Sequence, residues 1–142
     1  MHKRIREYLA TIYWHDGDPP PVVDLDLYFD GNDEEECIAP NAWGSGRPPI
    51  ATLFARFKEI AAMPNVQDVL VGLHFDWNDP LYIDAFPPAE NVHIITSATD
   101  PEVERWLVGL CCDGAIPGWP YGRPANAPQL GPGMNVFSVC WD

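Results

Sequence analysis

Two histidines and one aspartate have residue types and a spacing that could bind a metal ion. His74 and Asp76 stand two residues apart, and His93 follows them along the chain. Two histidines and one carboxylate are the ligand set of mononuclear non-haem iron enzymes. Residues two apart in a strand share one face of the sheet, so His74 and Asp76 could chelate the same ion. The spacing does not place His93 on that face, and a strand histidine is more often held by a local hydrogen bond. A metal-dependent enzyme is therefore one hypothesis, and a structural role for the three residues is its alternative.

A run of acidic residues could bind a partner through charge. Nine of the 21 acidic residues lie between Asp16 and Glu36, and seven form the candidate surface: Asp24, Asp26, Asp30, Asp33, Glu34, Glu35 and Glu36. Alternating apolar and polar residues over 22–30 predict a strand, which would place Asp24 and Asp26 together on its exposed face. Like charges this close repel each other, so the hypothesis is that they meet a positive surface. The alternative is a solvated surface without a partner.

An aromatic segment near the C-terminus offers a second recognition surface. Residues 118–124 combine Trp119, Tyr121 and Arg123 with two glycines and two prolines. Trp, Tyr and Arg supply much of the binding energy of protein interfaces. The segment either binds a protein or a small molecule, or is a loop held to the body by its two aromatic rings.

Motifs of covalent and nucleotide chemistry are missing from the sequence. Ser45 lies in Trp-Gly-Ser-Gly and lacks the Gly-x-Ser-x-Gly pattern of a nucleophile elbow, and there is no phosphate-binding or dinucleotide glycine fingerprint. The four cysteines show no metal-ligand spacing and are expected to be reduced thiols: Cys37, Cys111, Cys112 and Cys140. No catalytic residue and no cofactor is predicted from motifs, which favours a function without catalysis.

The net charge of −13 limits the classes of partner. It argues against nucleic acid and against anionic membranes, both of which attract clustered Lys and Arg. It favours a basic protein partner. No apolar run approaches the ~20 residues of a membrane span, and the charged N-terminus is followed by no apolar signal-peptide core, which predicts a cytoplasmic protein.

One amphipathic helix must organise the elements that position these residues. Over 50–61 the apolar side chains recur at helical spacing and share one face: Ile50, Leu53, Phe54, Phe57, Ile60 and Ala61. A strand is predicted over 69–77, where the period changes to two. A second helix is predicted from Thr99, whose spacing to Glu102 forms a capping box, to a stop at Gly114.

Five further strands are predicted from alternating or continuous apolar residues: 8–14, 22–30, 81–86, 91–96 and 134–141. The first two should pair as a hairpin, 81–86 should pair with 69–77, and the nearly apolar 91–96 should be central. Residues 113–133 hold five Gly and five Pro and are expected to form a long loop. The predicted fold is one α+β domain over 1–142, in the order ββαβββαβ. It has a single, mostly antiparallel sheet of five to six strands with two helices packed on one face.

The chain resembles the small acidic immunity proteins of bacterial toxin–immunity systems. The resemblance lies in short length, strong acidity, the α+β pattern and particular residues: the run 30–36, Asp24 and Asp26, and the aromatic residues Trp43 and Trp119. It implies a bacterial protein that covers the basic active-site surface of a cognate toxin. It also implies that no catalytic residue is present.

Overall fold

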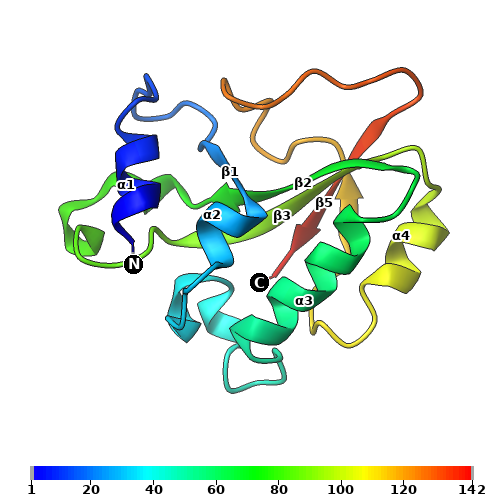
Figure 1. The fold of residues 1–142 in the computed structure, drawn as a ribbon, viewed down its shortest axis with the longest axis horizontal. Coiled ribbons are helices and arrows are strands. Elements are labelled where there is room, and N and C mark those ends of the chain that lie inside the picture. The colour runs from blue at the N-terminus through cyan, green and yellow to red at the C-terminus, as the bar shows by residue number, and fades with distance from the viewer. Residues whose placement is uncertain (1, 142) are drawn as a thin grey trace.

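Five strands form one antiparallel sheet in the order β1-β2-β3-β5-β4 in the computed structural model, which describes residues 2–141 (Figure 1). The strands are β1 (Val22–Asp24), β2 (Val66–Leu73), β3 (Ala89–Thr96), β4 (Ala115–Pro117) and β5 (Asn135–Cys140). The α+β class and the antiparallel sheet of five strands are therefore confirmed. β3 lies at the centre, as its continuous apolar sequence predicts.

Four α-helices and four short 3-10 turns complete the described chain. The helices are α1 (Lys3–Leu9), α2 (Leu25–Phe29), α3 (Ile50–Ala61) and α4 (Asp100–Trp106). The 3-10 turns are η1 (Glu35–Cys37), η2 (Pro40–Ala42), η3 (Phe75–Asn78) and η4 (Pro80–Tyr82). No helix within 2–141 has the length and apolar character needed to cross a membrane.

The helices pack on one face of the sheet, and α3 is central to that packing. The buried side chains of α3 are Ile50, Leu53, Phe57 and Ile60, and they share one core with residues of β2, β3 and β5. Val103 of α4 joins the same core, and Thr99 forms the predicted capping box with Glu102. The α3 prediction is confirmed at both ends, whereas α4 ends at Trp106, well before Gly114.

The long segment between β4 and β5 covers the other face of the sheet (Figure 1). A smaller cluster there joins Leu70, Ile95 and Val136 of the sheet to Ala127, with Trp119 and Met134 packed against it. The predicted loop 113–133 thus contains β4 and closes a second core. Its length follows from the area of sheet that it covers.

The strand predicted over 8–14 is wrong, because this part of the chain begins with helix α1. Ile5 and Leu9, four residues apart, are both buried in the main core. The helix then ends in a turn in which the Thr11 hydroxyl donates to the carbonyl of Tyr8 (2.6 Å). Helical spacing of two buried residues therefore outweighs the short alternation that predicted a strand.

The strand predicted over 22–30 is also wrong beyond its first three residues. β1 ends at Asp24 and α2 follows, which buries Leu25, Tyr28 and Phe29 at positions i, i+3 and i+4. The Tyr28 hydroxyl donates to the buried carbonyls of Cys37 (3.1 Å) and Pro87 (2.7 Å). β1 pairs with β2 and not with 8–14, so the predicted first hairpin does not form.

The strand predicted over 81–86 is replaced by turns, and β2 pairs with β3 instead. β2 itself begins at Val66 and ends at Leu73, so the end of the predicted strand 69–77 belongs to η3. The guanidinium of Arg6 donates to the carbonyls of Trp77 (3.1 Å), Ala85 (3.0 Å) and Tyr82. Carbonyls turned toward one arginine are not available to a neighbouring strand, which explains the irregular backbone. The observed order is α1-β1-α2-α3-β2-β3-α4-β4-β5 and differs from ββαβββαβ.

Candidate binding groove

His74 and Asp76 lie at the start of η3, past the end of β2. The ring Nδ1 of His74 accepts a hydrogen bond from the backbone N–H of Asp76 (3.0 Å) and lies 3.6 Å from Asp76 Oδ2. The two residues therefore form a local turn and do not share a strand face. Within residues 2–141, no group of three or more His, Cys, Asp or Glu side chains could hold a metal ion. The site predicted from His74, Asp76 and His93 has no geometric support.

His93 is buried under the segment that covers the second face of the sheet. Its Nδ1 lies 2.7 Å from the hydroxyl of Ser138, and that hydroxyl donates to the carbonyl of Gly118 (2.7 Å). The Ser138 oxygen is then the acceptor, so His93 carries its proton on Nδ1. The ring packs edge-to-face on Trp119, with centroids 4.8 Å apart. A Cβ at Gly72 would come within 2.4 Å of His93 Nε2, so a side chain at Gly72 would clash with the ring. His93 thus ties β3, β5 and the covering segment together.

Acidification is expected to destabilise the protein through His93. Burial lowers the pKa of His93 from 6.5 to about 4, so between these values the unfolded chain binds a proton that the folded chain does not. Stability present at pH 7 should therefore be lost as the pH falls from 6.5 to 4, by about 3 kcal/mol. Urea unfolding of wild type and His93→Gln across this range measures the effect, since the variant lacks this contribution. Parallel pH profiles for the two proteins would contradict the assignment.

The structure separates the two aspartates that were expected on one strand face. Asp24 is the exposed last residue of β1, whereas Asp26 lies in α2 and pairs with Lys58 (3.0 Å). Asp30 is exposed at the end of α2. The predicted continuous acidic strand face is therefore wrong, because the three carboxylates belong to β1, to α2 and to the end of α2.

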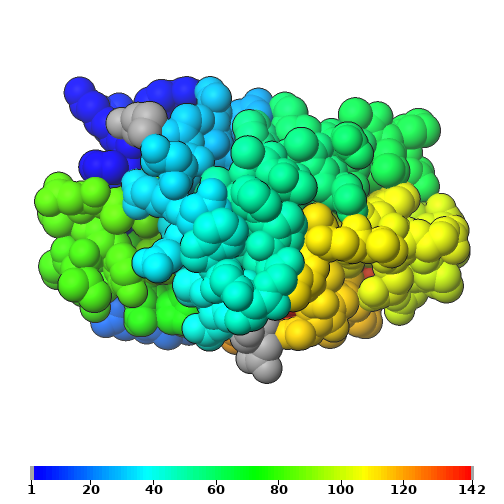
Figure 2. Space-filling view, turned by 90° about the horizontal axis from the view of Figure 1, so that it is seen from below, coloured from blue at the N-terminus to red at the C-terminus, as the bar shows by residue number. Residues whose placement is uncertain are grey.

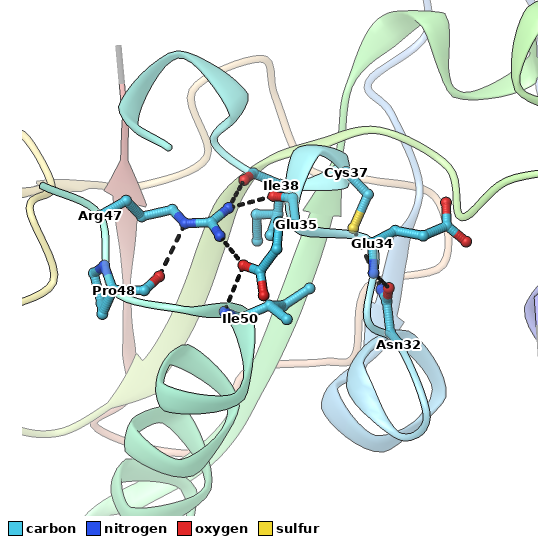
Figure 3. Close-up of polar contacts among 8 residues, drawn as sticks. All are labelled: Asn32, Glu34, Glu35, Cys37, Ile38, Arg47, Pro48 and Ile50. Atoms are coloured by element: carbon cyan, nitrogen blue, oxygen red, sulfur yellow. Dashed lines mark hydrogen bonds and ion pairs between the residues drawn. The ribbon is translucent and has the colours of Figure 1, made fainter. Parts of the chain in front are cut away.

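Glu35 lines the wall of a hollow but is half-buried and held by the buried Arg47 (Figure 3). Its Oε1 pairs with the buried guanidinium of Arg47 and accepts the backbone N–H of Ile50 (2.9 Å) at the start of α3. Arg47 also donates to the carbonyl of Ile38 (2.6 Å). Glu34 uses one oxygen to accept the N–H of Phe86 (3.1 Å). Glu35 therefore has a structural role. Glu34 uses one of its two carboxylate oxygens within the chain, which leaves the other for a partner.

Asp33 and Glu36 remain exposed and line a wide hollow of the described surface. This hollow has a volume of about 740 Å³, and its other walls include Trp43, Tyr82 and Phe86. Figure 2 shows the two segments that form it side by side, residues 33–43 in cyan and residues 82–88 in green. Trp43 is 38% exposed, and the guanidinium of Arg47 lies 4.5 Å from its ring centroid. The wide hollow therefore combines carboxylates with an aromatic surface.

A second, smaller hollow lies next to the first. Its volume is about 280 Å³, and its walls include Asp76, Glu90 and Trp141. Both hollows are lined by Pro40, Tyr82 and Pro88, so they lie on either side of a shared wall. We call the two together the acidic groove: a wide end at Asp33, Glu36 and Trp43, and a narrow end at Asp76, Glu90 and Trp141. Among the described residues that line either end, none is a lysine or an arginine.

The predicted aromatic recognition loop is mostly used for packing. Trp119 lies against His93, and Arg123 donates to the carbonyls of Ala127 (2.7 Å) and Pro128 (3.1 Å) within its own loop. Tyr121 is 47% exposed and packs on Phe75, with ring centroids 4.8 Å apart. Burial, and then the neighbouring Glu90 carboxylate, raise the pKa of Tyr121 to about 12. Tyr121 therefore neighbours Glu90, which lines the narrow end of the acidic groove, but Tyr121 does not itself line the groove.

A rigid loop next to the groove displays two aliphatic side chains. Leu81 and Ile83 are 79% and 66% exposed. The loop that carries them is held by the three Arg6 hydrogen bonds and by Asp79, which accepts the N–H of Leu81 (2.9 Å). The sequence places these residues between Asp79 and Asp84, but their alternation indicated a strand and concealed an exposed loop. Tyr82 was missed for the same reason, because the turn η4 brings it to the groove. Glu90 lies in β3, and no local pattern in the sequence shows that it lines the groove.

The comparisons with known proteins place the chain in a family. The family model described as Uncharacterized protein YfbO family matches residues 2–139. The chain is 27% identical over 125 residues to the Uncharacterized protein YfbO of Escherichia coli (strain K12), which covers 87% of this chain and 84% of that protein. No solved structure matches. The chain therefore belongs to the YfbO family.

Proposed function

We propose that this protein is a non-enzymatic binding protein that recognises a basic segment of a partner protein in the acidic groove. The observation that carries the proposal is a groove with acidic and aromatic walls and, among its described lining residues, no lysine or arginine. A guanidinium or ammonium group can stack on an aromatic ring and pair with a carboxylate at the same time. Trp43 already accepts the Arg47 guanidinium in this way from within the chain.

The exposed aliphatic residues favour a protein over a small cation as the partner. Leu81 and Ile83 stand next to Tyr82, which lines both ends of the groove. Exposed apolar side chains on a fixed loop can bury area on binding and lose little conformational entropy. Small cations have no apolar surface to place against them. In this arrangement the aliphatic pair provides affinity, and the carboxylates provide orientation.

The net charge of −13 would also speed association with a basic surface. A toxin with a basic active site, the partner class implied by the resemblance to immunity proteins, has the required chemistry. The YfbO family and its E. coli member are both described as uncharacterized, so the comparisons name no partner.

Selection from a random peptide library tests the proposal without a known partner. We expect peptides selected on the full chain at low salt to be enriched in Arg or Lys next to apolar residues. The double substitution Asp33→Asn/Glu36→Gln should lower the binding affinity for a selected peptide by about tenfold, because two exposed charge pairs contribute on the order of 1 kcal/mol or somewhat more to binding. Binding constants are measured by calorimetry with the synthesised peptide.

The matched control is Glu7→Gln/Glu59→Gln, which removes the same charge from exposed positions outside the groove. It should weaken binding by less than twofold. Equal weakening by both pairs would mean that only the net charge attracts the peptide. Selected peptides without basic residues would also overturn the proposal.

A further inference from the structure

We infer that the bound segment is extended and presents two cationic side chains, one to each end of the acidic groove. This inference rests on the proposed function and specifies the partner. Its basis is the division of the groove: Asp33 and Glu36 lie at the wide end, and Asp76 and Glu90 lie at the narrow end. Between them the shared wall is uncharged and consists of Pro40, Tyr82 and Pro88.

The charges at both ends are open to a ligand. Asp33 and Glu36 are exposed, and the side chain of Asp76 is 63% exposed. Glu90 is half-buried and is the neighbour of Tyr121. His74 lines the narrow end as well, and its Nδ1 accepts the Asp76 N–H. Glu34 and Glu35 also line the wide end, but Glu34 accepts the Phe86 N–H and Glu35 pairs with Arg47. Two further carboxylates are therefore open to a ligand at each end, and none of the described lining residues is a Lys or Arg.

The dimensions of the groove favour an extended segment over a helix. A helix with its side chains is about 10 Å across, so one turn occupies several hundred Å³. The narrow end, at about 280 Å³, is too small for a turn of helix but large enough for one long side chain. An extended chain can place two long side chains in the two hollows and cross the Pro40–Tyr82–Pro88 wall with small or apolar residues between them.

A peptide that carries two linked cations should bind more tightly than a peptide with one. Once the first arginine is bound, the second binds as an intramolecular event, so its effective concentration is high if the spacing is right. The probes are ten-residue peptides of Gly, Ser and one Leu that carry a single Arg at either of two positions, or both Arg residues at varied separation. NMR titration of the ¹⁵N-labelled full chain measures dissociation constants and shows which indole signals move, those of Trp43 or Trp141.

At one separation we expect the two-Arg peptide to bind at least tenfold more tightly than either single-Arg peptide and to shift both indole signals. Asp76→Asn/Glu90→Gln should lower the affinity for the two-Arg peptide to that for a single-Arg peptide. Asp76→Asn alone should also lower the affinity for the two-Arg peptide. The control Glu7→Gln/Glu59→Gln should keep the tighter binding of the two-Arg peptide. Circular dichroism of each variant checks that the fold is retained.

A gain of only about twofold at every separation would overturn the two-ended inference, since it is the statistical effect of a second charge. The proposed function would then stand if single-Arg peptides still require Asp33 and Glu36. If no basic peptide binds, both proposals fail. If free spermine binds as tightly as the best two-Arg peptide, with the same dependence on the variants, the occupant is a polyamine and the protein-segment inference is overturned.

Discussion

Replacing Arg47 by methionine is expected to lower the free energy of unfolding by about 3–5 kcal/mol, the usual cost of leaving one member of a buried ion pair without its partner. The Arg47 side chain is fully buried and is the cation opposite Glu35 (Figure 3). It also donates to the carbonyls of Glu35 (2.5 Å), Ile38 (2.6 Å) and Pro48 (3.0 Å). Methionine fills a similar volume but leaves a carboxylate and three carbonyls without this donor. Urea unfolding followed by tryptophan fluorescence measures the loss.

A double substitution separates the cost of a lone charge from the value of the pair. Glu35→Leu/Arg47→Met removes both charges, so it should cost less than Arg47→Met alone. The N–H of Ile50 would still lose its acceptor and the three carbonyls their donor, so a residual cost of about 1–3 kcal/mol is expected. A double variant less stable than the single one would contradict this explanation. The result bears on function, because it separates Glu35 from the acidic residues offered to a partner.

Replacing Phe57 by alanine is expected to cost about 3–5 kcal/mol as well, through lost burial and the cavity left behind. Phe57 has no exposed surface, lies on the buried face of α3 and packs edge-to-face on Trp141, with centroids 6.2 Å apart. Thermal and urea unfolding measure the change. Because Trp141 lines the narrow end of the groove, the same cavity should also loosen the groove wall.

Phe54→Ala provides the matched control on the same helix. Phe54 is half-buried and stacks on Phe29 with ring centroids 5.4 Å apart, so its removal opens a site that solvent and side chains can fill. Its cost should be clearly smaller, about 1–2 kcal/mol. Similar losses for the two variants would show that α3 is not anchored through the Phe57 face.

Long elements with one consistent period could be predicted, and short ones could not. Over twelve residues, α3 repeats its apolar positions at a spacing that only a helix satisfies. Residues 22–30 fit both periods, because Leu25, Leu27 and Phe29 alternate while Leu25, Tyr28 and Phe29 have helical spacing. Burial favours the helix, because in α2 the Tyr28 side chain is buried and its hydroxyl reaches the carbonyls of Cys37 and Pro87. A contact across 59 positions of the chain leaves no local trace in the sequence.

The sequence by itself determined the α+β class, the helix α3, the central strand and a strongly acidic protein without the motifs of covalent catalysis. Only the tertiary structure decided which carboxylates are available. It turned Glu35 inward to Arg47, paired Asp26 with Lys58, and brought Asp76 and Glu90 into one groove with Asp33 and Glu36. The physical reason is that charge is a property of composition, whereas the exposure of each charge depends on partners that are distant along the chain. Arg6, 76 positions from Tyr82, holds the loop that forms one wall of the groove.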